Sequence, residues 1–184
     1  MSLLNQTVYE ETDDWSNGVA KLYEYLSQDC VYANPLSLLT FLDNHATDRF
    51  HKNKEQSLNH DRYFQALTLL VTLRGIPQLY YGNEIGMYSN KANGDGPNRQ
   101  NFPEKALTKA GRDKKQNALF DFTKNILNWR KGNKSVQFGT LTHFAVRSGC
   151  YVYARQYEGK TVTVILNGTK EAQTLDLTPY QEVI

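Results

Sequence analysis

The sequence predicts an α/β protein followed by an antiparallel β unit, with the change of class near residue 135. Before that point, apolar residues recur at helical spacing in three segments, at about 14–27, 61–73 and 113–131. Between them lie two apolar runs, 36–42 and 76–81, which are too short for normal helices and are typical of buried strands. Helices that alternate with strands predict a parallel sheet or barrel. Beyond residue 135 the apolar period changes to two, which predicts antiparallel strands.

Each of the three helical segments has a recognisable end or face. The first has candidate N-terminal caps at Asp13, Asp14 and Ser16 and an apolar face of Trp15, Val19, Leu22, Tyr23 and Leu26. The second is apolar around most of its circumference, which predicts packing on more than one side. It ends at Arg74-Gly75, with Gly75 as the expected left-handed cap. The third is expected to bury Leu119, Phe122, Ile126 and Trp129.

The second part predicts a series of hairpins. Strands are expected at 151–157 and 161–166, joined through Glu158-Gly159. Asn167-Gly168 is a strong hairpin signal and predicts a further strand at 174–177. A long polar loop, 88–111, separates the last predicted parallel strand from the third helix, and a loop of this length in a compact domain indicates a functional role.

Composition excludes several classes of protein. The 184 residues contain 21 Lys and Arg and 19 Asp and Glu, a net charge of +2, so no nucleic-acid partner is expected. No run of about eighteen apolar residues occurs, so no membrane span is expected. Residues 1–5 lack the features of a signal peptide, and the compartment stays open. Cys30 and Cys150 indicate neither a metal cluster nor a disulfide framework.

Polar residues follow both predicted parallel strands. Asp43, Asn44 and His45 follow the first strand, and Glu84 follows the second. Because parallel strands present their carboxyl ends at one edge of a sheet, these residues predict a site there.

Two other interpretations stay open. In the first, Asp43, Asp48 and Arg49 form a structural ion pair and His45 is a core histidine. In the second, four residues bind a metal, although the helical spacing of a zinc-binding histidine pair is absent; they are Asp43, His45, His51 and His60.

Three segments resemble motifs of the α-amylase family, glycoside hydrolase family 13. Phe41-Leu42-Asp43-Asn44-His45-Ala46 resembles the family's Phe-x-Asp/Glu-Asn-His-Asp signature, and 75–87 resembles the motif on its last barrel strand. Gly94-Asp95-Gly96 with Arg99-Gln100-Asn101-Phe102-Pro103 is similar to a segment of the neopullulanase and cyclomaltodextrinase branch, although Asn101 replaces the branch's usual Asp. The motifs occur in the family's order.

The resemblance implies an eight-stranded (β/α)8 TIM barrel followed by an antiparallel β domain. A barrel alone needs about 250 residues. We therefore expect residues 1–135 to be the C-terminal portion of the catalytic barrel and residues 136–184 to be the β domain, shortened to a few strands. The chain is expected to be a C-terminal fragment of a larger enzyme.

The resemblance also implies specific site residues. The family is a retaining one, and its nucleophile and acid lie on earlier barrel strands. Its third carboxylate position is Ala46 here, and a methyl group accepts no hydrogen bond from a sugar, so no catalytic residue is intact. Glu84 is expected to be a structural carboxylate. The expected substrate-binding residues are His45, Asn44, Asp43, Arg49 and Arg99.

Two functions follow as hypotheses. The first is a fragment of an α-glucan hydrolase that acts on α-1,4 or α-1,6 linkages of starch-derived oligosaccharides, itself without a complete catalytic set. The second is a non-catalytic glucan-binding or structural module; an unrelated α/β hydrolase or sugar-binding protein is a third, plainer interpretation. No cofactor is expected, although calcium in the loop at 90–98 stays open because its oxygens lack regular calcium-loop spacing. The expected partners are an α-glucan oligosaccharide and, through unpaired strand edges, a second copy of the chain.

Overall fold

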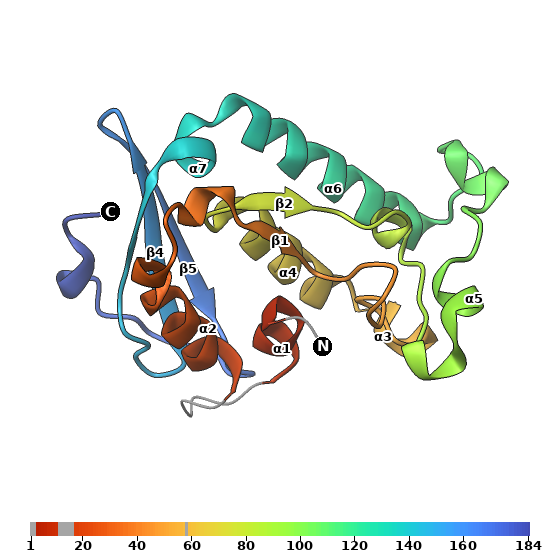
Figure 1. Cartoon of the computed structure of the whole chain (residues 1–184), viewed down its shortest axis with the longest axis horizontal. Helices are drawn as coiled ribbons and strands as arrows, with labels where there is room; N and C mark the ends of the chain where they lie inside the picture. Colours follow the sequence, from red (N-terminus) through yellow and green to blue (C-terminus); the bar gives the residue numbers. More distant parts are fainter. Residues whose placement is uncertain (1–2, 11–16, 58) are drawn as a thin grey trace.

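The computed structural model describes residues 3–10, 17–57 and 59–184 and contains two separate sheets (Figure 1). The helices are α1 (Leu3–Tyr9), α2 (Gly18–Ser27), α3 (Lys54–Ser57), α4 (His60–Thr72), α5 (Asp95–Asn98), α6 (Lys114–Gly132) and α7 (Lys134–Phe138). The strands are β1 (Leu39–Phe41), β2 (Ile76–Gln78), β3 (Thr140–His143), β4 (Cys150–Tyr157) and β5 (Lys160–Asn167). Among the described residues, no helix is both long enough and apolar enough to cross a membrane.

The parallel sheet consists of β1 and β2, as predicted. Leu39 pairs with Ile76 and Phe41 with Gln78, and the chain passes from one strand to the other through α3 and α4. Both strands are shorter than expected. The predicted strand at 36–42 begins late because Pro35–Ser37 forms a 3-10 turn, in which the Asn34 side chain accepts a hydrogen bond from Leu36 N.

The expected burial of these two strands is wrong. Leu39 is 57% exposed and Ile76 is 54% exposed. In the described part of the chain the parallel sheet has only these two strands, so the side chains that a larger sheet would cover remain at the surface. The two paired residues, Leu39 and Ile76, are called the open sheet surface below.

Helix α4 is the centre of the main core, as its apolar circumference predicts. Its buried residues are Tyr63, Ala66, Leu67, Leu69, Leu70, Val71 and Thr72. Arginine side chains satisfy the carbonyls near its C-terminus: Arg130 donates to Val71 O and Gly75 O, and Arg155 donates to Thr72 O at 3.0 Å. The cap itself is Leu73. Gly75 has the expected positive φ of 110°, but it lies beyond the cap, where a Cβ would meet Leu38 O at 2.6 Å.

Helix α6 confirms the third predicted helix with one correction. Asp113 and Gln116 form a capping box at its start. Leu119 is buried, and Phe122 and Ile126 pack against the core, but Trp129 is 42% exposed. Arg130 lies about three full turns after Leu119 and therefore continues the inward stripe in place of Trp129.

The antiparallel sheet has the order β3-β4-β5. The predicted turn at Glu158-Gly159 is confirmed; both residues have positive φ, 48° and 74°, as a two-residue hairpin requires. The hairpin predicted at Asn167-Gly168 is wrong, and residues 174–177 form no strand. The Asn167 side chain instead accepts hydrogen bonds from the backbone and hydroxyl of Thr169, which makes a local turn that does not return the chain to the sheet.

The two parts share one core. Tyr151 and Tyr153 of β4 belong to the same buried cluster as Leu22 of α2 and Leu67 of α4. The Tyr153 hydroxyl also meets Thr72 Oγ1 at 2.6 Å. Figure 1 shows the antiparallel sheet at one end of the molecule and the polar loop with α5 at the other.

Helices α1 and α7 are additional to the predicted elements. The candidate caps Asp13, Asp14 and Ser16 lie outside the described residues.

Candidate functional site

The signature segment after β1 forms a tight turn at residues 44–47. Asn44 Oδ1 accepts hydrogen bonds from Ala46 N at 2.8 Å and Thr47 N at 3.1 Å, and Thr47 Oγ1 accepts from Asn44 N at 3.1 Å. Asn side chains readily make such turns with their own backbone. As a result, His45 and Ala46 are exposed at the tip, and Asn44 supports them from within.

Asp43 lies fully buried beneath this turn and connects it to the segment that follows β2. Its carboxylate accepts hydrogen bonds from Phe50 N at 2.7 Å and from Asn83 Nδ2 at 2.6 Å. Burial raises the pKa of Asp43 to about 6, although these two hydrogen bonds and the nearby Arg49 guanidinium favour the charged form. Asp43 therefore closes the loop 43–50 and does not itself reach the surface.

Arg49 is also fully buried, away from the tip of the turn. Its Nη1 donates to Tyr81 O at 2.8 Å, and its guanidinium carbon lies 4.6 Å and 4.9 Å from the ring centroids of Tyr80 and Tyr81. The structural ion pair considered for Asp43, Asp48 and Arg49 does not form among the described residues: Asp48 pairs with Lys52 at 3.1 Å, and Asp43 accepts from Phe50 N and Asn83. Arg49 anchors the turn to the residues that follow β2.

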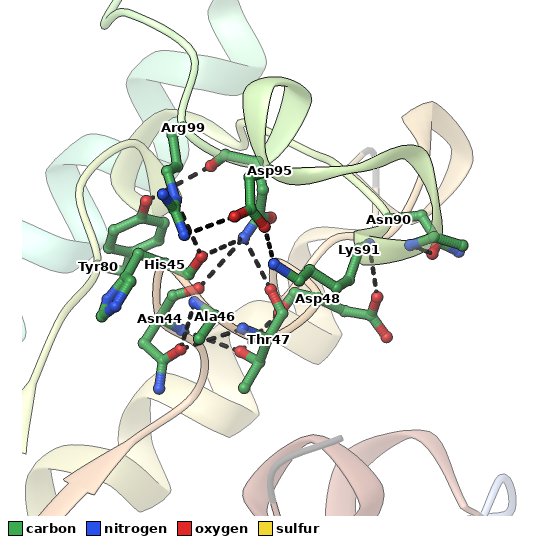
Figure 2. A network of polar contacts seen from close by, with 12 residues as sticks. Asn44, His45, Ala46, Thr47, Asp48, Tyr80, Asn90, Lys91, Asp95 and Arg99 are labelled. Carbon is green, nitrogen blue, oxygen red and sulfur yellow. Dashed lines mark hydrogen bonds and ion pairs between the residues drawn. The ribbon is translucent and has the colours of Figure 1, made fainter.

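The segment that contains α5 covers the other side of the turn, as Figure 2 shows. Arg99 Nε donates to His45 O at 3.3 Å, and Arg99 Nη2 pairs with Asp95 at 2.9 Å. Lys91 also pairs with Asp95, and its backbone N donates to Asp48 Oδ1 at 2.8 Å. Of the predicted substrate-binding residues, the structure brings His45, Asn44 and Arg99 together at the surface and places Asp43 and Arg49 below them.

The oxygen atoms of the loop at 90–98 are engaged with the protein itself. The Asp95 carboxylate pairs with two cations, Lys91 and Arg99, and Asn90 Oδ1 accepts from Ala92 N. This arrangement does not resemble a calcium loop.

The residues of the metal hypothesis are also dispersed. His51 is buried against Phe50 and Tyr63, His60 lies against Phe64, and His45 is exposed. Within residues 3–10, 17–57 and 59–184, no three His, Cys, Asp or Glu side chains form a group that could hold a metal.

Three residues that the sequence patterns do not identify as site residues also support the turn: Asn83, Tyr80 and Asn98. Asn83 holds Asp43, and the Tyr80 hydroxyl donates to Asn98 O at 3.4 Å. Asn98 donates to the turn itself. In the sequence, the one indication of their role is that they lie close to the motif residues Glu84 and Arg99.

Glu84 has a structural role. Its Oε2 accepts a hydrogen bond from Gly82 N at 2.8 Å, and burial raises the pKa of its carboxyl group.

Comparison with known families divides the chain into two matches. Residues 5–139 match the α-amylase catalytic domain, and residues 141–184 match the C-terminal domain of cyclomaltodextrinase. The two matches meet where β3 of the antiparallel sheet begins.

Individual relatives agree with this division. A cyclomaltodextrin glucanotransferase of Bacillus sp. (strain 17-1) is 28% identical over 87% of this chain and 20% of its own length, and one of Niallia circulans is 33% identical over 69% of this chain and 16% of its own length. An α-amylase structure from Anoxybacillus superposes with a TM-score of 0.64 at 28% identity, covering 83% of this chain and 32% of that one. The α-amylase of Geobacillus thermoleovorans gives a TM-score of 0.61 at 30% identity, with the same shares covered.

The chain spans about a fifth of the length of the curated relatives that it matches. Its parallel strands β1 and β2, with α4 and α6, are the C-terminal part of an α-amylase-type (β/α)8 barrel, and the antiparallel sheet is the domain that follows. The turn with His45 and the segment with Arg99 lie within the catalytic-domain match. This chain belongs to the α-amylase family, glycoside hydrolase family 13.

Proposed function

We propose that this chain contributes a glucan-binding surface to an α-amylase-family enzyme that acts on α-1,4 or α-1,6 linkages of starch-derived oligosaccharides, as neopullulanases and α-amylases do. One observation carries the proposal: the turn at 44–47 and Arg99 meet at the carboxyl ends of two parallel strands, with His45 exposed. In (β/α)8 barrels this edge of the sheet carries the active site.

The side chains at this edge suit sugar hydroxyl groups. His45 can donate or accept a hydrogen bond, and Arg99, whose side chain is 47% exposed, offers several donors. Asp95 holds the Arg99 guanidinium in place, so little side-chain freedom is lost when a sugar binds. The names of the relatives, which are glucanotransferases and amylases, support an α-glucan as the ligand.

Hydrolysis by this chain alone is not expected. A retaining glycosidase needs a nucleophile and an acid on either side of the scissile bond. Of the family's three carboxylates, the signature places only the third on this chain, and Ala46 occupies that position. The exposed methyl group of Ala46 also favours the second candidate function, a non-catalytic glucan-binding or structural module.

The proposed division of the chain assigns residues 1–135 to the barrel portion and 136–184 to the β domain. This boundary falls inside α7, the short helix that directly precedes β3. We also propose that the chain self-associates through the open sheet surface, where Leu39 and Ile76 lack a covering strand among the described residues.

Isothermal titration calorimetry with maltoheptaose tests the binding surface. Replacing His45 or Arg99 with alanine should weaken the affinity about five- to tenfold each, since each change removes hydrogen bonds worth about 1 kcal/mol or more. Arg147→Ala removes an exposed arginine from the other end of the chain and should leave the affinity unchanged. Equal affinity for all four proteins, or no binding by any of them, would contradict the proposal.

A gain-of-function variant tests the role of position 46. Ala46→Asp restores a carboxylate acceptor at the tip and should tighten maltoheptaose binding several-fold. The matched control, Ala92→Asp, places the same charge at an exposed position of the neighbouring segment and should change the affinity little. Neither the wild type nor Ala46→Asp should release reducing sugar above a no-protein control. Release by a preparation free of contaminating amylase would overturn the expectation that the catalytic set is incomplete.

A further inference from the structure

Two asparagine side chains hold the turn at 44–47 from opposite sides. Asn44 Oδ1 accepts from the backbone N–H groups of Ala46 and Thr47. The carbonyl groups of the same turn point the other way, toward Asn98, the last residue of α5. Asn44 therefore binds two backbone N–H groups of the turn, and Asn98 faces three of its carbonyl groups.

Asn98 contacts the carbonyl groups of the turn through a single atom, its side-chain nitrogen Nδ2. Asn98 is fully buried, and its Nδ2 lies 2.8 Å from Thr47 O, 3.3 Å from His45 O and 3.4 Å from Asn44 O. Carbonyl oxygens can only accept, so the group that faces them must be a donor. The other amide atom, Oδ1, is buried and has no hydrogen-bond donor among the described residues, which is unfavourable.

Asn98 is itself held in place by neighbouring groups. Its own carbonyl accepts from the Tyr80 hydroxyl, which belongs to the segment after β2. Its chain neighbour Arg99 donates to His45 O and pairs with Asp95 at the start of α5. Beside the hydrogen bond from Arg99, the Asn98 amide is the buried donor group of α5 that faces the turn, with two hydrogens for three carbonyl oxygens.

We propose that Asn98 is a positioning residue: its amide group, acting as a donor and not as a space-filling side chain, sets the orientation in which His45 and position 46 meet a bound sugar. The sugar part of this proposal rests on the proposed function. The effect on the turn does not, and it can be measured in the free chain.

Three variants test whether the Asn98 side chain acts as a hydrogen-bond donor or only fills space. Asn98→Asp keeps the shape but places oxygen atoms against three carbonyl oxygens, whereas Asn98→Ala removes both shape and donor. Asn90→Ala is the matched control, because it removes an amide from the same polar loop, where Asn90 caps Ala92 N and does not touch the turn.

The readout is ¹H–¹⁵N NMR of each free protein. We expect hydrogen exchange at the Ala46 and Thr47 amides to accelerate at least tenfold in Asn98→Ala and more in Asn98→Asp, with shifted His45 ring signals. The amide of Thr123 in α6 should keep its protection in both. Asn90→Ala should match the wild type. If Asn98 only fills space, Asn98→Asp will resemble the wild type, and that result overturns the proposal.

A second arm measures maltoheptaose affinity, which we expect to fall at least fivefold in both Asn98 variants and not in Asn90→Ala. Faster exchange at the turn with no sugar bound by the wild type contradicts the proposed function and supports the positioning of the turn. Unchanged exchange contradicts the positioning even when the sugar binds. Loss of the folded state in both Asn98 variants would show that Asn98 supports overall stability, and that result also overturns the proposal.

Discussion

The central strand of the antiparallel sheet, β4, and the first strand of the parallel sheet, β1, are both rich in apolar residues, yet they differ in burial. In β4, the residues from Cys150 to Arg155 are all buried between two neighbouring strands. Tyr151 and Tyr153 pack with α2 and α4, whereas Val152 and Ala154 pack on the opposite face with Tyr180 and Val183. In β1, Leu39 is more than half exposed, and in the described part of the chain β1 pairs with β2 on one side only. The difference lies in what the rest of the described chain supplies to each strand.

The polar ends of the strands do not share this difference. The turn after β1 is organised by its own asparagine, by Asp43 and by the α5 segment. These contacts are local or reach the segment after β2, and none depends on covering the open sheet surface. A surface can therefore keep the geometry of a binding site while the sheet beneath it remains open.

The largest effect that tests this comparison is a pair of identical substitutions. Leu166→Ala in β5 removes a side chain that is 8% exposed and packed in the main core, and it should lower the free energy of unfolding by about 2–5 kcal/mol. Leu39→Ala in β1 should cost less than about 0.5 kcal/mol. Urea unfolding of both variants measures the two values. Equal losses would show that β1 is buried in solution.

The second effect is a dependence of stability on pH that arises from Asp43. Because burial raises its pKa to about 6 in the folded chain, above the usual value of 3.8, the folded state binds more protons between these values. The free energy of unfolding should therefore fall as the pH rises from about 4 to 6.5, by on the order of 2 kcal/mol relative to Asp43→Asn. Urea unfolding at several pH values, with Asp121→Asn on the exposed face of α6 as control, measures this difference. A difference that is flat or rises with pH would contradict the buried position of Asp43.

The third effect concerns association. Micromolar samples should sediment as species larger than a monomer, because the open sheet surface exposes apolar side chains and unpaired strand edges. Leu39→Lys should weaken the association about tenfold or more. Ile165→Lys, at a position that is also about half exposed but lies on β5 of the antiparallel sheet, should have little effect. A clean monomer at these concentrations would mean that the parallel pair needs no cover.

The elements best predicted from sequence are those whose apolar pattern is satisfied inside the chain. Helix α4 and the β4–β5 hairpin begin and end within a residue or two of the prediction. Trp129 was misassigned because an arginine, Arg130, occupies the inward position at that turn of α6. An apolar pattern alone does not reveal a buried arginine that binds helix carbonyls.

Site residues could be predicted from sequence where they belong to a motif. They could not be predicted where a side chain binds the backbone of a distant segment. The motifs led to His45 and Arg99, which the structure brings together. Asn98 binds three carbonyl groups contributed by a turn some fifty positions earlier, a contact that no local pattern encodes. Similarly, Asn167 reads as a hairpin residue, but its side chain turns back on Thr169.

The most direct test of glucan binding at this edge of the sheet is a ¹H–¹⁵N NMR titration of the intact chain with maltoheptaose. We expect the largest shifts at the amides of His45, Ala46 and Thr47 and at Arg99, while β4 and β5 stay unperturbed and the sugar remains uncleaved. Shifts confined to the antiparallel sheet, or none at saturating sugar, would contradict the claim that the carboxyl ends of β1 and β2 form a glucan-binding surface.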